Sequence, residues 1–314
     1  MKSALVTGGA GFIGSALVRG LLREGCERVV VIDNLLSGKQ ENLAGVEKPV
    51  EFHLADVRNL EEIEPLFDGI EVVFHEAGLV SVPRSIEEPL LAHDINVSGT
   101  LNVLLAAHRR GVRRVVYAAS SAAYGDSPEL PKTEGLLPQP KSPYAVQKLA
   151  GEYYLRVFWE AFGLETVSFR YFNVFGPRQD PGSPYSGVLS IFSSCALEGR
   201  APTIFGDGEQ SRDFIYVDDI VRLNLVAASS PNAPGNVYNG GTGRRQSLNQ
   251  AWTAMQKVAG IDLPARYGPE RAGDVRHSQA DISAARRDLG FEPAVDFEEG
   301  MRRTLQWYRE QGPG

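Results

Sequence analysis

The stretch SALVTGGAGFIG at residues 3–14 decides how the rest of the chain is interpreted. Its apolar run, residues 4–6, predicts a buried strand, and a helical pattern of leucines follows the last glycine. Between them, Gly8, Gly11 and Gly14 fit the pattern GxxGxxG. Such glycines permit a tight turn and let backbone amides approach a pyrophosphate at the helix N-terminus. The alternative is a glycine turn without a ligand, but a strand before and a helix after are the context of dinucleotide binding.

A second strand, residues 28–32, ends in Asp33 and Asn34. Asp33 comes about 20 residues after Gly14, where an acidic side chain binds the adenosine ribose hydroxyls in dinucleotide-binding folds. A carboxylate there would repel a 2′-phosphate, and no arginine follows it directly, so NAD is favoured over NADP. The alternative is a polar residue that only caps the strand.

Further apolar runs predict strands at residues 50–54, 72–75, 115–119 and 166–170, with helical patterns at 89–110 and 144–162. This alternation predicts an α/β fold with a doubly wound parallel sheet. Beyond residue 174, Gly and Pro clusters recur, which indicates a smaller C-terminal lobe. We expect an NAD-binding domain at 1–174 with a return segment near 213–240, and a mainly substrate-binding lobe at 175–314.

Composition excludes several classes of protein. The chain has 314 residues, 43% of them hydrophobic, and a net charge of −7 without a basic stripe, which argues against a nucleic-acid binder. Cys26 and Cys195 lie in helical patterns without metal-ligand spacing, so we expect no metal site and a reducing cytoplasm. No apolar run approaches ~18 residues and no leader precedes the first strand, so no membrane span is expected.

A serine pair, a tyrosine and a lysine are candidates for catalysis. Ser120 and Ser121 end the strand at 115–119, where ligands bind in open α/β sheets. Tyr144 and Lys148 are four apart on a predicted helix and share a face. An ammonium lowers the pKa of a nearby phenol, so the set suits proton exchange with an alcohol. The alternative is a surface pair on an amphipathic helix.

The C-terminal lobe contains charged residues that are candidates to bind a second, charged ligand: Arg212, Arg271, Arg276, Asp213 and Asp274. A planar guanidinium binds pyrophosphate oxygens in pairs. Each arginine alone is also compatible with an exposed ion pair. Residues 126–143 contain five prolines and predict a loop over the site.

With these features in view, the sequence resembles the extended short-chain dehydrogenase/reductase family and, within it, the nucleoside-diphosphate-sugar 4-epimerases. The markers span almost the whole chain: TGGAGFIG at 7–14, Asp33, Asp56-Val57, SSAAYGD at 120–126, YAVQK at 144–148, RYFNVFGPRQ at 170–179, SRDFIYVDD at 211–219 and AGDVRHSQAD at 272–281.

The resemblance implies roles for individual residues. Tyr144 would be the acid/base, Lys148 would hold the nicotinamide ribose and polarise Tyr144, and Ser120 would contact the sugar O4. Implied NAD-binding residues are Gly8, Gly11, Phe12, Ile13, Gly14, Asp33, Asn34, Gly38, Asp56, Val57, Ala77, Gly78, Asn96, Tyr144, Lys148 and Tyr171. Implied UDP-sugar-binding residues are Ser121, Asn173, Val188, Thr203, Ile204, Phe205, Arg212, Arg271, Asp274 and Ser278. The resemblance also implies a homodimer through helices near 89–110 and 144–162.

Two positions bear on the reaction and the substrate. Ala122 stands where the related dehydratases and decarboxylases have Asp or Glu, which disfavours those reactions. Ser278 stands where members restricted to glucose can carry Tyr, so there is room for a 2-N-acetyl group. The implied function is epimerisation of UDP-N-acetylglucosamine and UDP-N-acetylgalactosamine. The alternatives are the UDP-glucose/UDP-galactose pair, a net dehydrogenase or reductase, and a silent NAD-binding regulator.

Overall fold

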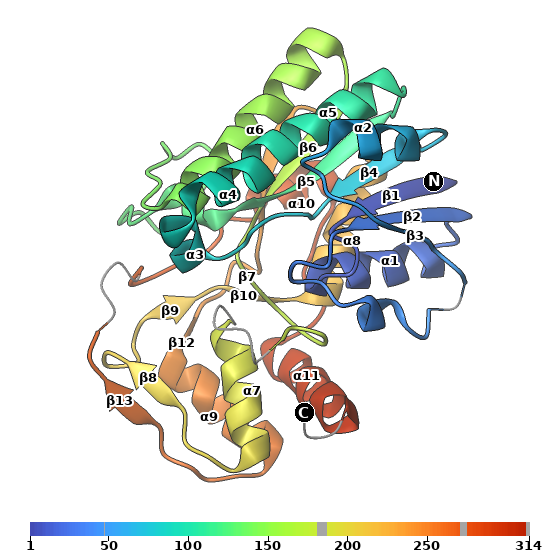
Figure 1. Cartoon of the computed structure of the whole chain (residues 1–314). Helices are drawn as coiled ribbons and strands as arrows, with labels where there is room; N and C mark the ends of the chain where they lie inside the picture. Colours follow the sequence, from blue (N-terminus) through green and yellow to red (C-terminus); the bar gives the residue numbers. More distant parts are fainter. Residues whose placement is uncertain (47, 181–186, 271–274, 312–314) are drawn as a thin grey trace.

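The computed structural model describes residues 1–46, 48–180, 187–270 and 275–311. Its centre is a seven-stranded sheet in the order β11-β6-β5-β4-β1-β2-β3, in which every neighbouring pair is parallel (Figure 1). The strands are β1 (Ser3–Thr7), β2 (Arg28–Asp33), β3 (Glu51–Leu54), β4 (Val72–His75), β5 (Arg114–Ser120), β6 (Glu165–Tyr171) and β11 (Asn236–Gly240). The strand order reverses at β1, between β2 and β4. In such sheets the crevice at this reversal binds ligands.

Helices cover both faces of the sheet, which confirms the doubly wound α/β prediction. One face carries α1 (Phe12–Arg23) and α8 (Val217–Ser229), and the other carries α2 (Leu60–Ile63), α5 (Gly99–Arg109) and α6 (Pro143–Phe162). Side chains of a strand alternate between its faces. Val6 therefore packs in the cluster under α1 and α8, while Leu5 packs in the cluster under α5 and α6.

The helical stretch expected at 89–110 is continuous but irregular. It consists of α4 (Pro89–His93), a π-helical turn η3 (Asp94–Ser98) and α5, and α3 (Val82–Glu87) precedes it. By length and composition, Pro89–Arg109 is apolar enough to cross a membrane, with a mean hydropathy of 1.2. More than half of its most apolar window is buried, and α4, η3 and α5 all pack on α6. A core helix of a globular domain has the same properties.

A smaller lobe lies below the sheet in Figure 1. Its helices are α7 (Val188–Glu198), α9 (Leu248–Ala259) and α11 (Phe297–Gln311), while α10 (Ser283–Leu289) packs near β11. Short strand pairs lie outside the central sheet: β7 (Asn173–Phe175) with β10 (Phe214–Tyr216), β8 (Thr203–Phe205) with β13 (Arg266–Gly268), and β9 (Ser211–Arg212) with β12 (Gln246–Ser247). Short 3₁₀ turns are η1 (Gln40–Leu43), η2 (Glu64–Phe67) and η4 (Ser121–Tyr124).

The two cysteines are free and buried. Cys195 lies in α7 as expected, but Cys26 lies after the end of α1, so its assignment to a helix was wrong. The helix ends earlier because Gly25, with φ of +80°, adopts a left-handed conformation that favours glycine. Within the described residues, no group of three or more His, Cys, Asp or Glu side chains is placed to hold a metal ion.

Candidate active site

A pocket of about 830 Å³ opens at the carboxyl ends of the central strands. It brings together segments that are far apart in the sequence, from the first glycine turn to the lobe. The predicted residues that line it are Gly8, Gly11, Phe12, Ile13, Gly14, Asp33, Asn34, Gly38, Val57, Ala77, Gly78, Ser120, Ser121, Tyr144, Lys148, Tyr171, Asn173, Arg212 and Ser278. One hollow therefore contains both the residues expected at a cofactor and those expected at a second ligand.

The glycine turn forms one end of this pocket and leaves no room for side chains. A Cβ on Gly14 would lie 2.1 Å from the carbonyl oxygen of Gly8, and one on Gly8 would lie 2.7 Å from the amide of Ala77. Gly8 also has a φ of +68°. The turn leads into α1, whose first-turn amides have no partner within the helix and attract anions. These residues fit the pyrophosphate of a dinucleotide.

Asp33 ends β2 on the wall of the same pocket. Its carboxylate accepts hydrogen bonds from the amides of Ala10 (2.9 Å) and Leu35 (2.8 Å), while burial raises its pKa. Asp33 thus fixes the glycine turn relative to β2 and also borders the pocket. The strand cap and the pocket residue, weighed above as alternatives, are both seen in the structure.

The helix with Tyr144 and Lys148 starts at the pocket. Ser142 caps it by accepting a hydrogen bond from the Ala145 amide (3.2 Å), and Pro143 occupies its first turn. Further along, Glu152 of α6 forms a buried ion pair with Arg170 of β6 at 2.8 Å. Removing one partner of such a pair leaves a buried charge, at a cost of roughly 3–5 kcal/mol. This pair therefore holds α6 in register with the sheet.

Ser120 and Tyr144 line the same pocket, as the sequence predicts for a proton-transfer site. The hydroxyl of Ser120, which accepts a hydrogen bond from the Ala122 amide (3.2 Å), lowers the pKa of Tyr144. Burial has the larger effect and raises that pKa above its ordinary value. The prediction that Lys148 lowers the pKa of Tyr144 was wrong for this structure. Burial removes water from both side chains, so it disfavours the charged phenolate of Tyr144 and also the charged ammonium of Lys148.

Lys148 is buried, with 2% of its surface exposed. Its Nζ donates a hydrogen bond to the carbonyl oxygen of Ala118 at 2.8 Å and lies 4.9 Å from the ring centre of Tyr117. Burial lowers the pKa of Lys148 to about 8, and the negative charge of Glu76 counteracts this. Because this pKa lies close to neutral pH, nearby charges can change the protonation state of Lys148, which fits a site that transfers protons.

Some residues implied by the resemblance do not line the pocket. Asn96 lies behind Gly78 and holds the backbone of Leu79 through hydrogen bonds of 2.8 and 3.1 Å. Asp56 accepts hydrogen bonds from Asn34 and Arg58. The others belong to the lobe: Val188 starts α7, and Thr203, Ile204 and Phe205 form β8. Arg271 and Asp274 lie outside the described residues. The roles of all of these stay predictions.

Asp213 was expected to be a candidate for ligand binding, and the structure places it elsewhere. It is fully buried and accepts hydrogen bonds from the Thr242 amide (2.8 Å) and hydroxyl (2.7 Å), the Gly243 amide (2.9 Å) and the Ala280 amide (3.1 Å). It thereby connects three segments of the lobe. Arg276 forms a bidentate pair with Asp207 on the surface, the ordinary alternative for an arginine.

We therefore predict that Asp213→Asn destabilises the fold. An amide in place of the carboxylate turns an N–H group toward buried donors and loses charge-assisted hydrogen bonds, at a cost of roughly 2–3 kcal/mol. Thermal unfolding followed by circular dichroism measures the effect. Asp207→Asn is the matched control, because its carboxylate lies at the surface. Equal melting temperatures for the two variants would contradict this assignment.

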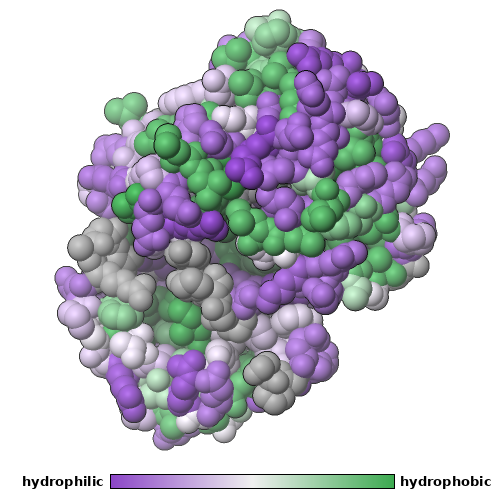
Figure 2. All heavy atoms as spheres, in the orientation of Figure 1, coloured by the Kyte–Doolittle hydropathy of each residue, from purple (hydrophilic) through white to green (hydrophobic). Residues whose placement is uncertain are grey.

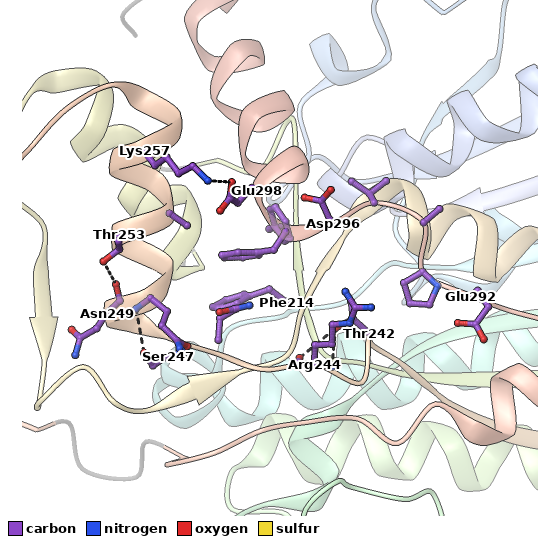
Figure 3. Close-up of a pocket in the computed structure, with 18 of the residues that line it drawn as sticks. Phe214, Thr242, Arg244, Ser247, Asn249, Thr253, Lys257, Glu292, Asp296 and Glu298 are labelled. Atoms are coloured by element: carbon purple, nitrogen blue, oxygen red, sulfur yellow. Dashed lines mark hydrogen bonds and ion pairs between the residues drawn. The ribbon is translucent and has the colours of Figure 1, made fainter.

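A second hollow, of about 990 Å³, lies on the lobe between β12, α9 and the start of α11 (Figure 3). It shares no residue with the first pocket. Its floor includes the stacked rings of Phe214 and Phe297, and Lys257 pairs with Glu298 at 2.7 Å across its edge. Since this pair already satisfies both charges, the hollow is a less suitable catalytic site than the pocket with Tyr144.

The pocket also contains residues that the sequence analysis did not single out. They include Glu76, Lys132, Lys141, Ser142 and Gln179. Ser142 and Lys141 lie just before Tyr144, so their position in the sequence could have pointed to the site. Glu76 directly follows β4, and a carboxylate at the end of a buried strand could have pointed to the site in the same way. For Lys132 and Gln179 only the folded loops reveal the proximity.

Comparisons with known proteins agree with this geometry. The sequence profile of the family described as "NAD dependent epimerase/dehydratase family" matches residues 4–241. The chain is 40% identical to the "UDP-glucose 4-epimerase" of Mycolicibacterium smegmatis, over 98% of each chain. Its fold is similar to that of a UDP-N-acetylglucosamine 4-epimerase from Methanobrevibacter ruminantium in complex with UDP-N-acetylmuramic acid (TM-score 0.94, 41% identity, 99% of each chain). It is also similar to UDP-glucose 4-epimerase of Thermotoga maritima with UDP-glucose (TM-score 0.93, 40% identity, 98% of this chain and 99% of the other).

Proposed function

Because this chain belongs to the NAD dependent epimerase/dehydratase family, we propose that it is a 4-epimerase of UDP-hexoses. The observation that carries the proposal is the meeting of Ser120, Tyr144 and Lys148 with the glycine turn in one pocket. The relatives named as 4-epimerases support the choice within the family, since they match the chain over nearly its full length.

Each residue of the site has its own role in the proposed reaction. When bound, NAD supplies a hydride acceptor and donor for the sugar C4. Tyr144 takes the proton of the sugar O4 as a phenolate and later returns it as a phenol, while the Ser120 hydroxyl forms hydrogen bonds to the Tyr144 oxygen and the sugar oxygen. Lys148 provides positive charge beside them. Asn173 and Arg212, which also line the pocket, bind the diphosphate so that the 4-keto sugar turns over without leaving.

Ala122 supports epimerisation over elimination. It lines the pocket next to the serine pair, so the segment offers a methyl group where a dehydratase needs a carboxyl group. An elimination or decarboxylation step requires an acid or base at the reacting carbon. Among the described pocket residues, the carboxylates are Asp33, Glu76 and Asp126, and none of them occupies the position of Ala122 directly after the serine pair.

For the substrate we propose UDP-N-acetylglucosamine and UDP-N-acetylgalactosamine, with the UDP-glucose/UDP-galactose pair as the alternative. Ser278 supports the acetylated pair because this small side chain lines the pocket, leaving volume for an acetamido group. The relatives do not separate the two, since one similar structure is named for each substrate at nearly equal identity. A roomy pocket also accepts the smaller sugar.

The experiment compares turnover of purified protein on both UDP-sugar pairs. Epimerisation of the acetylated pair with the higher kcat/KM supports the proposal. Ser278→Tyr should reduce kcat/KM for the acetylated pair by about 10- to 200-fold more than for the other, as steric exclusion from a pocket does. Net accumulation of NADH or of dehydrated product would show a dehydrogenase or dehydratase instead.

We also propose a homodimer in the cytoplasm. Apolar side chains are exposed on α3, α4 and α6, which pack against one another, and Figure 2 shows hydrophobic residues gathered over α4. The most exposed are Ile86, Leu90, Val146, Tyr153 and Phe162. Exposed apolar patches mark protein interfaces. A mass of one chain by light scattering would contradict the dimer.

A further inference from the structure

Glu76 lies on the wall of the pocket immediately after β4, with its carboxylate fixed by a chain of buried hydrogen bonds. The hydroxyl of Tyr171 donates to Glu76 Oε1 at 3.0 Å, and the same hydroxyl accepts from Asn224 Nδ2 at 2.7 Å. Asn224 is fully buried in α8 and also donates to the carbonyl oxygen of Ile220. The position of the carboxylate is therefore fixed by a hydrogen-bond chain that ends on α8, on the opposite face of the sheet from α6.

Lys148 lies beside the same segment. Its Nζ is 3.1 Å from the point where a Cβ on Gly78 would stand, two residues beyond Glu76. Among the described residues, no carboxylate lies within ion-pair distance of this Nζ, and its one hydrogen bond is to Ala118. Glu76 and Lys148 line the same pocket, and the charge of Glu76 acts against burial to raise the pKa of Lys148. A buried ammonium needs such a charge, because burial alone favours its neutral form.

We propose that Glu76 is a positioning residue whose carboxylate, held by Tyr171 and Asn224, keeps Lys148 in the ammonium form beside Tyr144. The inference rests on the proposed function in one respect, that Lys148 serves the proton transfer of Tyr144. Glu76 itself is not expected to touch the reacting sugar atoms.

The pKa values of the pair define a narrow range of pH. Burial raises the pKa of Glu76 to about 7, with Tyr171 and Lys148 acting against it, and lowers the pKa of Lys148 to about 8. Glu76 is therefore negative above about pH 7, and Lys148 is positive below about pH 8. Both charges coexist between these values. Loss of the Glu76 charge removes support for the ammonium and moves the Lys148 pKa down.

The other titratable groups that face the pair keep one charge state through this range. Burial lowers the pKa of His75 to about 3, so its imidazole is neutral. Burial raises the pKa values of Tyr117 and Tyr171, so these phenols are protonated, and it also raises the pKa of Tyr144, the group that exchanges its proton with the sugar. Glu152 is paired with Arg170. Glu76 and Lys148 are thus the groups whose charges change near neutral pH.

The first test measures the Lys148 pKa directly and needs no turnover. The chain has seven lysines, so labelling with ¹³Cε-lysine gives a simple spectrum in which Lys148→Arg identifies one signal. In Glu76→Gln the midpoint of this signal should fall by about one pH unit, as expected for losing a nearby opposite charge. Glu76→Asp keeps the charge and should restore most of the shift.

Glu134→Gln is the matched control. Glu134 is another partly buried carboxyl group that accepts a backbone hydrogen bond, from Asn239 at 2.8 Å, and it does not act on Lys148. Its replacement should leave the Lys148 midpoint unchanged. An unchanged midpoint in Glu76→Gln overturns the proposal. If that variant does not fold, Glu76→Ala also removes the charge and should lower the Lys148 midpoint by about one pH unit, and an unchanged midpoint in that variant overturns the proposal.

The second test uses the pH dependence of kcat. Because Lys148 must be protonated, the alkaline limb of the profile should move to lower pH in Glu76→Gln by the shift seen in the spectrum. A purely structural loss would lower kcat at every pH without moving the limb, and that result overturns the positioning role. If the spectrum shifts but the parent protein epimerises no UDP-sugar, the proposed function fails while the charge pairing stands.

Discussion

Tyr144→Phe is expected to lower kcat for epimerisation by about 10²- to 10⁴-fold, the usual contribution of a positioned general acid/base. The change removes one oxygen atom and keeps the ring in place at the start of α6. The sugar O4 then has no phenolate to receive its proton. Binding of the UDP-sugar should change little, since the diphosphate is assigned to Asn173 and Arg212.

Tyr154→Phe is the matched control because Tyr154 lies on the same helix with a partly exposed ring that does not line the pocket. Turnover should be unaffected in that variant. Isothermal titration with UDP separates binding from catalysis in both proteins. If Tyr144→Phe turned over at the parent rate, Tyr144 would have no part in proton transfer and another residue of the pocket would be responsible.

The central sheet could be predicted because its strands are buried on both faces. Such strands read as continuous apolar runs, and the runs at 72–75 and 115–119 coincide with β4 and most of β5. β11 has no such run, since Asn236–Gly240 contains two asparagines and a glycine. Its place beside β6 depends on packing from distant segments, which a local pattern does not contain.

The pocket could be predicted in part for a similar reason. Parallel strands end at one edge, so the residues after β1, β2 and β5 had to meet there. Asp213 shows the limit of this reasoning. The residues before it, Ser211 and Arg212, are polar and charged, as in a binding segment, yet the donors that satisfy it come from residues 242, 243 and 280. Burial by remote segments also decides the pKa of Tyr144, which the lysine spacing could not reveal.

Gly14→Ala is expected to weaken binding of NADH by about 10- to 100-fold, which corresponds to roughly 1–3 kcal/mol of strain from one added methyl group. Its Cβ would lie 2.1 Å from the Gly8 carbonyl oxygen and 2.8 Å from Gly9 Cα. A Cβ atom is not found this close to another heavy atom in proteins. Because the obstructing atoms belong to the backbone, the glycine turn itself would have to move. The amides that face the pyrophosphate would then lose their arrangement.

Gly135→Ala is the matched control, since a Cβ there has no neighbour within 4 Å and the residue does not require a left-handed backbone. Titration of each purified variant with NADH, followed by nicotinamide fluorescence, gives the dissociation constants. Circular dichroism at the titration temperature shows whether Gly14→Ala is folded. A folded Gly14→Ala protein that binds NADH as tightly as Gly135→Ala would mean that the glycine turn does not hold the pyrophosphate. The cofactor would then have to lie elsewhere in the pocket, and the alignment of Tyr144 with the nicotinamide would lose its basis.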